Sequence, residues 1–181
     1  GTTSNLGVLR PQVGPTMAIL STGGLGRSPQ RGDDMGFPGA RGDESTLNLT
    51  LAVPAHAHSL QLDFFFLSAE YPEFVGSRYN DRFTITVEGE AWTGDAAIDS
   101  AGNPININSV LFEIIDSAPL SGSGFDRGMG GGTGWLTAIV PVSPSSQITL
   151  ALKIADVSDG IYDSTVLVDA FRWSSTVADH A

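Results

Sequence analysis

Apolar and polar residues alternate along much of this chain, which is the pattern of a half-buried β-strand. The clearest case is 148–154, where Ile148, Leu150, Leu152 and Ile154 alternate with polar or small residues. The same pattern recurs at 47–53, 60–66, 83–87 and 136–140. Mixed runs rich in β-branched and aromatic residues are typical of central strands. Such runs lie at 110–115 and 165–173, and a short early strand is expected at 17–20.

Clusters of turn-forming residues separate these segments, and no stretch carries the apolar stripe and caps of an amphipathic helix. At most one helical turn is expected, at 71–74. About eight to ten strands without helices predict an all-β fold, a two-sheet antiparallel β-sandwich that is jelly-roll-like. Glycine-rich segments at 21–46 and 117–134 predict long loops. Since no repeat or boundary divides the chain, we expect one domain over 1–181, with its core at about 17–174.

Composition and net charge limit the classes of molecule that this chain is expected to bind. The chain of 181 residues is 41% hydrophobic, which suits a globular domain. Its formal net charge of −11 argues against nucleic acid and anionic membrane surfaces as partners. The apolar runs are too short for membrane insertion, and any secretion signal is expected to lie outside this sequence. The chain has no cysteine, so disulfides and thiolate metal sites are excluded, and another bound metal is one way to stabilise a secreted domain.

Carboxylates are crowded in the loop IADVSDGIYDS, where Asp156, Asp159 and Asp163 fall within eight positions. Each of these like charges raises the cost of ionising the next. Calcium takes six to eight oxygen ligands, and closely spaced aspartates supply several of them from one segment. The spacing is not that of an EF-hand, and a solvated acidic loop is the alternative interpretation.

A second group of oxygen donors lies in SAEYPEFVGSRYNDRF, residues 68–83, which contains Glu70, Glu73, Asn80 and Asp81. A calcium ion shared between this segment and the acidic loop would offset the repulsion among the carboxylates. An ordinary turn before a strand is the alternative for Asn80 and Asp81. Glu113 and Asp116 are weaker candidates for the same site.

Aromatic residues in loops are candidates for ligand contacts. Trp92 lies in a polar, turn-prone region and Tyr162 lies in the acidic loop, and such rings stack on sugars or anchor peptides. Asp126 of the second glycine-rich loop is a third candidate. Trp135 and Trp173 stand at strand ends and are expected in the core.

Other motifs give weaker signals. Two RGD triplets, at 31–33 and 41–43, resemble integrin-binding loops, although a three-residue match arises easily in a loop of this composition. His56 and His58 would suit zinc if they shared a strand face, but a loop is favoured there. A glycosidase pair such as Glu70 with Glu113 is conceivable, yet any acidic sandwich offers such pairs, and we expect no enzyme.

The segment FFFLSAEYPEFVGSRYNDRFTITVEG, residues 64–89, resembles the bacterial choice-of-anchor L domain family. Further matching stretches occur in order and cover most of the chain from 17 to 174: ILSTG, INSVLFEIID, GTGWLTAIVPV and DGIYDSTVLVDAFRW. The resemblance implies a secreted or surface-displayed module of a large bacterial protein. It also implies calcium ligands at Glu70, Asn80, Asp81, Asp156 and Asp163, to which Asp159 is added from spacing alone.

We therefore expect a non-enzymatic, calcium-stabilised recognition or adhesion module that is extracellular or at the cell surface. Its expected partners are a carbohydrate or peptide ligand on another cell or surface, and neighbouring domains of a larger protein. One alternative is a structural spacer with purely structural calcium. A polysaccharide hydrolase is the less favoured alternative.

Overall fold

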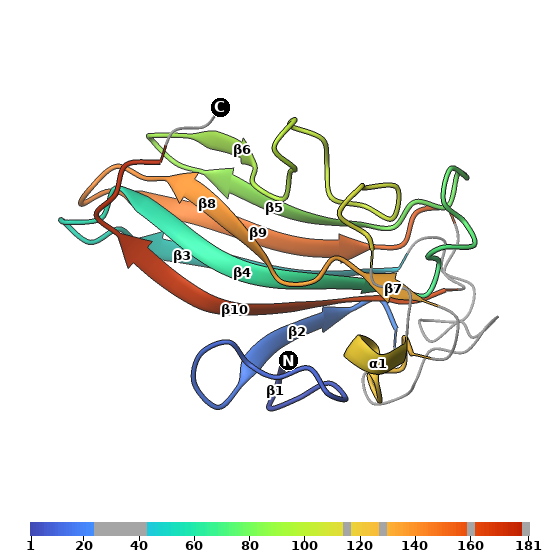
Figure 1. Cartoon of the computed structure of the whole chain (residues 1–181). Helices are drawn as coiled ribbons and strands as arrows, with labels where there is room; N and C mark the ends of the chain where they lie inside the picture. The colour runs from blue at the N-terminus through green and yellow to red at the C-terminus, as the bar shows by residue number, and fades with distance from the viewer. Residues whose placement is uncertain (24–42, 114–116, 127–129, 159–161, 179–181) are drawn as a thin grey trace.

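The computed structural model describes residues 1–23, 43–113, 117–126, 130–158 and 162–178, which form an antiparallel β-sandwich (Figure 1). One sheet has six strands in the order β1-β2-β10-β4-β7, with β8 also paired to β4, and the other has the order β3-β9-β5-β6. The first sheet consists of β1 (Thr2–Thr3), β2 (Met17–Ser21), β4 (Ser59–Ser68), β7 (Gly131–Gly132), β8 (Leu136–Pro141) and β10 (Ser164–Ser174). The second consists of β3 (Glu44–Ala52), β5 (Arg82–Glu88), β6 (Thr93–Asp95) and β9 (Gln147–Ala155). The predicted all-β sandwich is confirmed.

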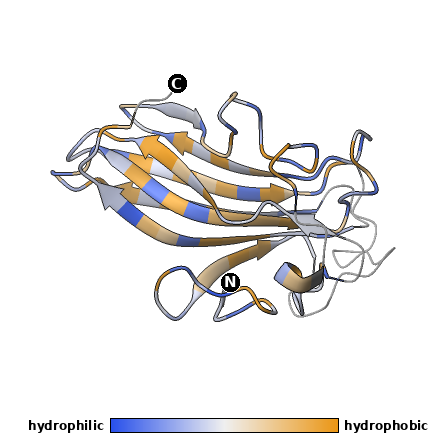
Figure 2. Ribbon diagram, viewed as in Figure 1, coloured by the Kyte–Doolittle hydropathy of each residue, from blue (hydrophilic) through white to orange (hydrophobic). Residues whose placement is uncertain are grey.

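The alternation in the sequence corresponds to the two faces of each strand (Figure 2). In β9, Ile148, Leu150, Leu152 and Ile154 are all buried between the sheets, while the residues between them are exposed or half-buried. The uninterrupted apolar run FFFL in β4 does not alternate in this way, because both faces of the strand are buried there. Phe64 and Phe66 point into the core between the sheets, whereas Phe65 and Leu67 belong to a second apolar cluster on the outer face of the six-stranded sheet.

That outer cluster explains why β4 is apolar on both faces. The N-terminal segment and the short helix α1 (Ser117–Leu120) cover it, contributing Leu9 and Leu120. Trp135 packs edge-on against Phe65, with ring centroids 5.8 Å apart. Trp173, on β10, packs against the core between the sheets, so both tryptophans that were expected inside contribute to apolar packing.

One expected strand is wrong. In the described part of this run, residues 110 and 111 lie in a turn, residues 112 and 113 have no regular structure, and Val110 is 77% exposed. Local hydrogen bonds compete with strand pairing here, because Asn106 Oδ1 accepts the Asn108 N–H and Ser109 Oγ accepts the Leu111 N–H. The turn expected at 71–74 is present, and its end is marked by a Phe74 N–H bond to the Glu70 carbonyl.

No helix in the described ranges is long and apolar enough to cross a membrane.

Candidate functional site

Six strand ends from both sheets meet at one end of the sandwich. Strands β2, β4 and β9 end there, and β3, β5 and β10 begin there. This end lies on the right in Figure 1. Loops from distant parts of the sequence are therefore neighbours, as the Thr22 N–H bond to the Ser164 carbonyl (3.0 Å) demonstrates.

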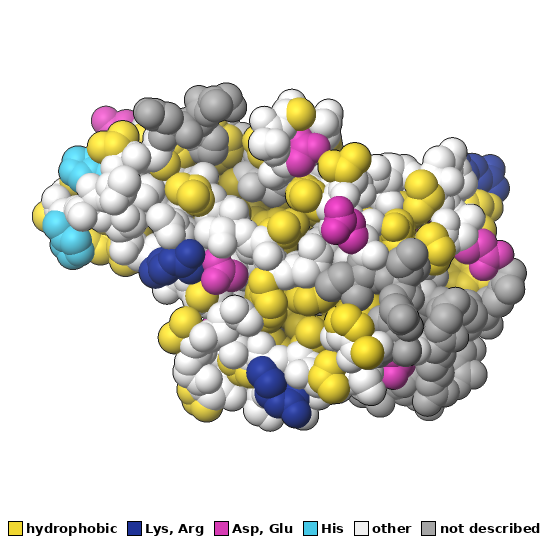
Figure 3. Space-filling model, in the orientation of Figure 1, with side chains coloured by type: hydrophobic (Ala, Val, Ile, Leu, Met, Phe, Trp, Pro, Cys, Tyr) yellow, Lys and Arg dark blue, Asp and Glu magenta, His cyan; other side chains and the backbone are white. Residues whose placement is uncertain are grey.

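Five carboxylates are buried at this end, and we call them the acidic cluster. Their residues are between 0% and 8% exposed: Asp43 8%, Glu70 2%, Asp81 0%, Asp156 6% and Asp163 3%. On the face seen in Figure 3, by contrast, the visible acidic side chains lie apart from one another. Burial of so many acids in one place is unusual, because a carboxylate withdrawn from water is costly unless it is protonated or paired.

Asp81, just before β5, links the members of the cluster. Its Oδ1 accepts the Val157 N–H (3.0 Å) and its Oδ2 accepts the Ser164 hydroxyl (2.7 Å). Its own N–H donates to Glu70 Oε2 (3.3 Å). Desolvation nevertheless raises the pKa of Asp81, because these hydrogen bonds only partly offset the loss of water.

Asp156, just after β9, is the least satisfied member. Among the described residues neither of its carboxylate oxygens has a hydrogen-bond partner of good geometry, although the Thr22 hydroxyl and the Asp81 carboxyl are close enough to affect its titration. Desolvation, followed by the charge of Asp81, raises the pKa of Asp156 to about 10, and the charge of Asp163 adds to the effect. Without a cation this carboxyl is protonated at neutral pH.

Asp43 and Asp163 complete the cluster. The Asp43 carbonyl accepts the Asp156 N–H (2.9 Å), and its carboxylate Oδ2 has no hydrogen-bond partner within the described ranges. The Asp163 carboxylate lies directly against Gly23, and a Cβ added at position 23 would collide with it. Position 23 therefore needs glycine for the Asp163 carboxylate to pack there.

The donors at this end suit a hard cation. Besides the carboxylates, the buried Asn80 Oδ1 has no hydrogen-bond partner in the described part of the chain. Carboxylate, amide and hydroxyl oxygens are the ligands that calcium prefers. No three His, Cys, Asp or Glu side chains of the described residues are arranged to hold a metal, so any ion would require these side chains to close around it.

The residues predicted as metal ligands are thus largely neighbours. Glu70, Asp81, Asp156 and Asp163 belong to one cluster, with Asn80 adjacent in sequence. Asp159 lies outside the described residues, as does Asp116. The exposed Glu113 follows a turn, and its N–H donates to the Gly132 carbonyl.

The three predicted ligand-contact residues do not share one surface. Tyr162 packs against Phe74, with ring centroids 5.1 Å apart, and borders the outer apolar cluster. Asp126 follows Phe125 of the same cluster, and its Oδ2 accepts the Gly122 N–H (2.6 Å). Trp92 is half-buried between β5 and β6, at the opposite end of the sandwich, about 20 Å away along the seven residues of β5.

The structure also shows where the histidine pair and part of the second RGD triplet lie. His56 and His58 are exposed at the end opposite the acidic cluster, on the left in Figure 3, so they contribute nothing to it. The triplet 31–33 lies outside the described residues. In the second triplet, 41–43, the aspartate is the buried Asp43, whose position does not suit integrin recognition.

Sequence reasoning missed three residues of this end: Asp43, Thr22 and Ser164. Their common signal is position, since each lies within one residue of a strand end, as Asp81 and Asp156 do. The Thr22 hydroxyl links β2 to β10, because it accepts the Ser164 N–H (2.9 Å) and donates to the Ser164 carbonyl (3.3 Å), whereas the Ser164 hydroxyl donates to Asp81 Oδ2.

Comparison with known proteins identifies the domain. The family model of the choice-of-anchor L domain matches residues 39–172, a range that contains the whole acidic cluster. No curated protein matches the chain, and no solved structure does. Choice-of-anchor domains suggest an anchored surface or secreted protein. The chain therefore belongs to the choice-of-anchor L domain family, whose members are modules typical of surface and secreted proteins.

Proposed function

We propose that this domain is a calcium-stabilised recognition module of an anchored surface or secreted protein. The observation that carries the proposal is the acidic cluster, in which five buried carboxylates meet and neither Asp156 oxygen has a hydrogen-bond partner of good geometry among the described residues. Such a cluster is stable only if protons or a cation neutralise it. Calcium supplies two positive charges and accepts irregular sets of oxygen ligands.

The ligands we propose are Asp81, Asp156 and Asp163, with Glu70 and Asn80 completing the set. Asp43 is an additional donor that the fold brings beside Asp156. When bound, the ion neutralises the repulsion and ties together loops that follow or precede β3, β4, β5, β9 and β10. Because the unfolded chain has no such site, the free energy of binding adds to the free energy of unfolding.

A competing source of positive charge is the segment 24–42, which contains Arg27, Arg31 and Arg41. Among the described bases, Arg172 pairs with Asp63, and Lys153 pairs with Glu44, the residue after Asp43. Arg78 and Arg82 lie on either side of Asn80 and Asp81 in the sequence. If arginine neutralised the carboxylates, calcium would add nothing to the stability. Calcium dependence therefore separates the two explanations.

The proposed ligand is a carbohydrate or a peptide. Tyr162 precedes β10 on the side of the acidic cluster and packs against the outer apolar cluster, and Asp126 follows Phe125 of that cluster in the sequence, so these two are the better candidates for a common binding surface. Trp92 would contact a ligand only at the other end of the molecule. Glu70 is buried, and it accepts the Asp81 N–H, which argues for a supporting role and against catalysis.

A structural spacer is the second candidate, and one observation favours it. No member of the cluster is more than 8% exposed, so a cation there would be enclosed and would present no open coordination position to a ligand. The cation would then stiffen the domain between its neighbours without contacting a partner.

Thermal unfolding in calcium and in EDTA, followed by a glycan and peptide array, tests the proposal. We expect calcium in excess to add a few kcal/mol of apparent stability, about 2.7 kcal/mol at 100 times Kd. The triple variant Arg27→Gln, Arg31→Gln, Arg41→Gln should keep this gain. Equal melting temperatures in calcium and EDTA would contradict the cation site.

The array distinguishes the two roles. Binding that is lost in EDTA and in Tyr162→Ala, but retained in Trp92→Ala, supports recognition. A silent array with a large calcium effect on melting identifies the spacer.

A further inference from the structure

The two sheets are unequal in width beside β3. Strand β2 contacts β3 and β9 across the sandwich, and β1 extends the six-stranded sheet beyond β2. Strand β3 is the edge of the four-stranded sheet and pairs along all nine residues with β9. No other strand of the described residues pairs with its free edge. Within the described ranges, the smaller sheet thus has no strand opposite β1.

An apolar cleft opens at this position. Its volume is about 340 Å³, and the leucines of β3 (Leu47, Leu49, Leu51) line it together with Leu150 and Leu152 of β9. Leu47 is 36% exposed although its register partner Leu152 is only 3% exposed. Inward-facing leucines on β3 thus lack the cover that the same face of β9 has.

A β-bulge in β10 holds an aromatic ring at the same cleft. The register with β4 shifts between Asp169 and Arg172, and Ala170 takes a left-handed conformation with φ 51°. Phe171, within the bulge, lines the cleft while remaining 44% exposed. Bulges re-aim side chains, and this one directs a large apolar group to the opening.

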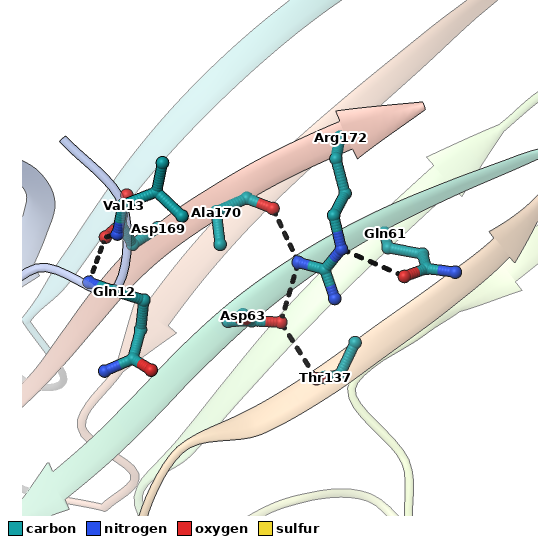
Figure 4. A network of polar contacts seen from close by, with 8 residues as sticks. All are labelled: Gln12, Val13, Gln61, Asp63, Thr137, Asp169, Ala170 and Arg172. Carbon is teal, nitrogen blue, oxygen red and sulfur yellow. Dashed lines mark hydrogen bonds and ion pairs between the residues drawn. The ribbon is translucent and has the colours of Figure 1, made fainter. Parts of the chain in front are cut away.

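Polar contacts hold the bulge in place (Figure 4). Arg172 donates to the Ala170 carbonyl (2.7 Å), to Asp63 (3.1 Å) and to Gln61 (3.0 Å). On the other side of the bulge, Asp169 accepts the N–H groups of Gln12 and Val13, which fixes the N-terminal loop there. The exposed Phe171 therefore stands on a supported backbone.

The free edge of β3 also lacks the usual protection against pairing. Exposed edges are commonly blocked by lysine, proline or a bulge, and the sequence ESTLNLTLA has none of these. Its single charge, on Glu44, is paired with Lys153. Among the residues that the structure describes, no strand therefore pairs with the outer edge of these nine residues.

We infer that β3 accepts an extended segment of another polypeptide as an added strand. Main-chain hydrogen bonds to β3 would supply register, and apolar side chains at alternate positions would enter the cleft between Leu49 and Phe171. The net charge of −11 favours a segment with basic ends. A second copy of this domain is a disfavoured partner, because its strand β1 would collide with β1 of the first copy. Two copies, each with a net charge of −11, would also repel each other.

Titration of the ¹⁵N-labelled domain with a synthetic peptide tests this inference. The probe is acetylated, amidated Lys-Leu-Thr-Leu-Thr-Leu-Thr-Leu-Lys, and the control has the same composition as Lys-Thr-Leu-Leu-Thr-Leu-Leu-Thr-Lys. We expect the probe to shift the amide signals of 44–52 and of Phe171 and to slow amide exchange along β3. The scrambled peptide, and the probe with N-methylated leucines, should have neither effect.

Matched variants on the two faces of β3 complete the test. Leu49→Lys should weaken binding by roughly tenfold or more, since a buried leucine contact is lost. Asn48→Lys, on the outer face of the same strand, should leave affinity within about twofold. The spectra of both variants report whether they are folded.

Three results would overturn the inference. They are the absence of shifts in β3 at millimolar probe, equal binding of the N-methylated peptide, and concentration-dependent dimerisation that Leu49→Lys abolishes. The titration is run in calcium and in EDTA, because β3 begins beside Asp43 of the acidic cluster, whereas the cleft is lined by Leu47, Leu49 and Leu51 farther along the strand. Failure of the cation proposal is thereby seen independently of failure here.

Discussion

At the scale of single residues, burial in the acidic cluster opposes ionisation of the carboxyl groups. Asp81 has hydrogen bonds to both carboxylate oxygens, yet its pKa is still raised, because removal of water outweighs them. Asp156 has no such bonds of good geometry among the described residues, and its pKa is raised to about 10. The cluster therefore takes up protons when no cation is present.

Replacement of Asp156 by its neutral isostere tests this view. Without metal at pH 8, Asp156→Asn should be more stable than the wild type by about 1–3 kcal/mol, because asparagine is neutral and folding no longer requires a proton to bind at this position. The melting temperature should rise by about 3–10 °C in EDTA, and the gain on adding calcium should fall by more than half.

The matched control is Asp99→Asn in an exposed loop, where the carboxylate accepts the N–H groups of Ala101 and Asn103. This variant should keep the full calcium response. An Asp156→Asn protein with an undiminished calcium gain would exclude Asp156 as a ligand.

Acidic residues in two segments, together with the family resemblance, suggest one site that contains Glu70, Asn80, Asp81, Asp156, Asp159 and Asp163. The structure places four of these carboxylates close together: Glu70, Asp81, Asp156 and Asp163. Asp43 could not be found that way. It stands in an Arg-Gly-Asp triplet after a glycine-rich segment, and only the pairing of β3 with β9 reveals it as a neighbour of Asp156. Long-range pairing is not encoded in local spacing.

At the scale of elements, burial differs between strands that have the same alternating pattern. Leu47 on β3 and Leu152 on β9 are register partners with the same period-2 signal, yet one is 36% exposed and the other 3%. Alternation shows which side chains face inward, but not whether the opposite sheet extends far enough to cover them. The edge position of β3 decides this.

The two leucines therefore predict unequal costs of truncation. Leu152→Ala should lower the free energy of unfolding by about 2–5 kcal/mol, as for other fully buried leucines. Leu47→Ala should lower it by about 1 kcal/mol or less. Urea denaturation of both variants under the same conditions provides the comparison, and similar costs would mean that β3 is covered in solution.

The strand predicted at 110–115 is wrong for a different reason. Its apolar and β-branched composition predicts a strand, but the side chains of Asn106 and Ser109 bond to the nearby backbone and fold its first part into turns. Phe112 still reaches the core, where it packs against Phe66 with ring centroids 5.2 Å apart. Apolar composition therefore predicts burial here, but not strand pairing.

At the scale of the whole molecule, the cluster couples stability to pH. The native chain holds protons on Asp81 and Asp156 over a pH range in which the unfolded chain, with ordinary carboxyl pKa values, has released them. The native state binds more protons than the unfolded state, so the free energy of unfolding decreases as pH rises. For the metal-free domain this decrease extends from about pH 4 to about pH 10.

Urea denaturation in EDTA at pH 5, 7 and 9 measures the effect. Stability should fall across this series in the wild type, and the fall should be smaller in the double variant Asp81→Asn, Asp156→Asn. Saturating calcium should also reduce the slope, since the cation replaces the protons. Stability that is constant or rises from pH 5 to pH 9 in EDTA would contradict the raised pKa values.

Whether the acidic cluster binds calcium is decided by calorimetric titration of calcium into the EDTA-stripped, dialysed domain at pH 7.5, repeated in buffers with different ionisation enthalpies. We predict saturable binding with a Kd of about 1 mM or tighter, a heat that varies with the buffer because protons leave the carboxylates, and loss of both in Asp81→Asn, Asp156→Asn. No saturable binding at several millimolar calcium, or binding that the double variant retains, would contradict a calcium site in this cluster.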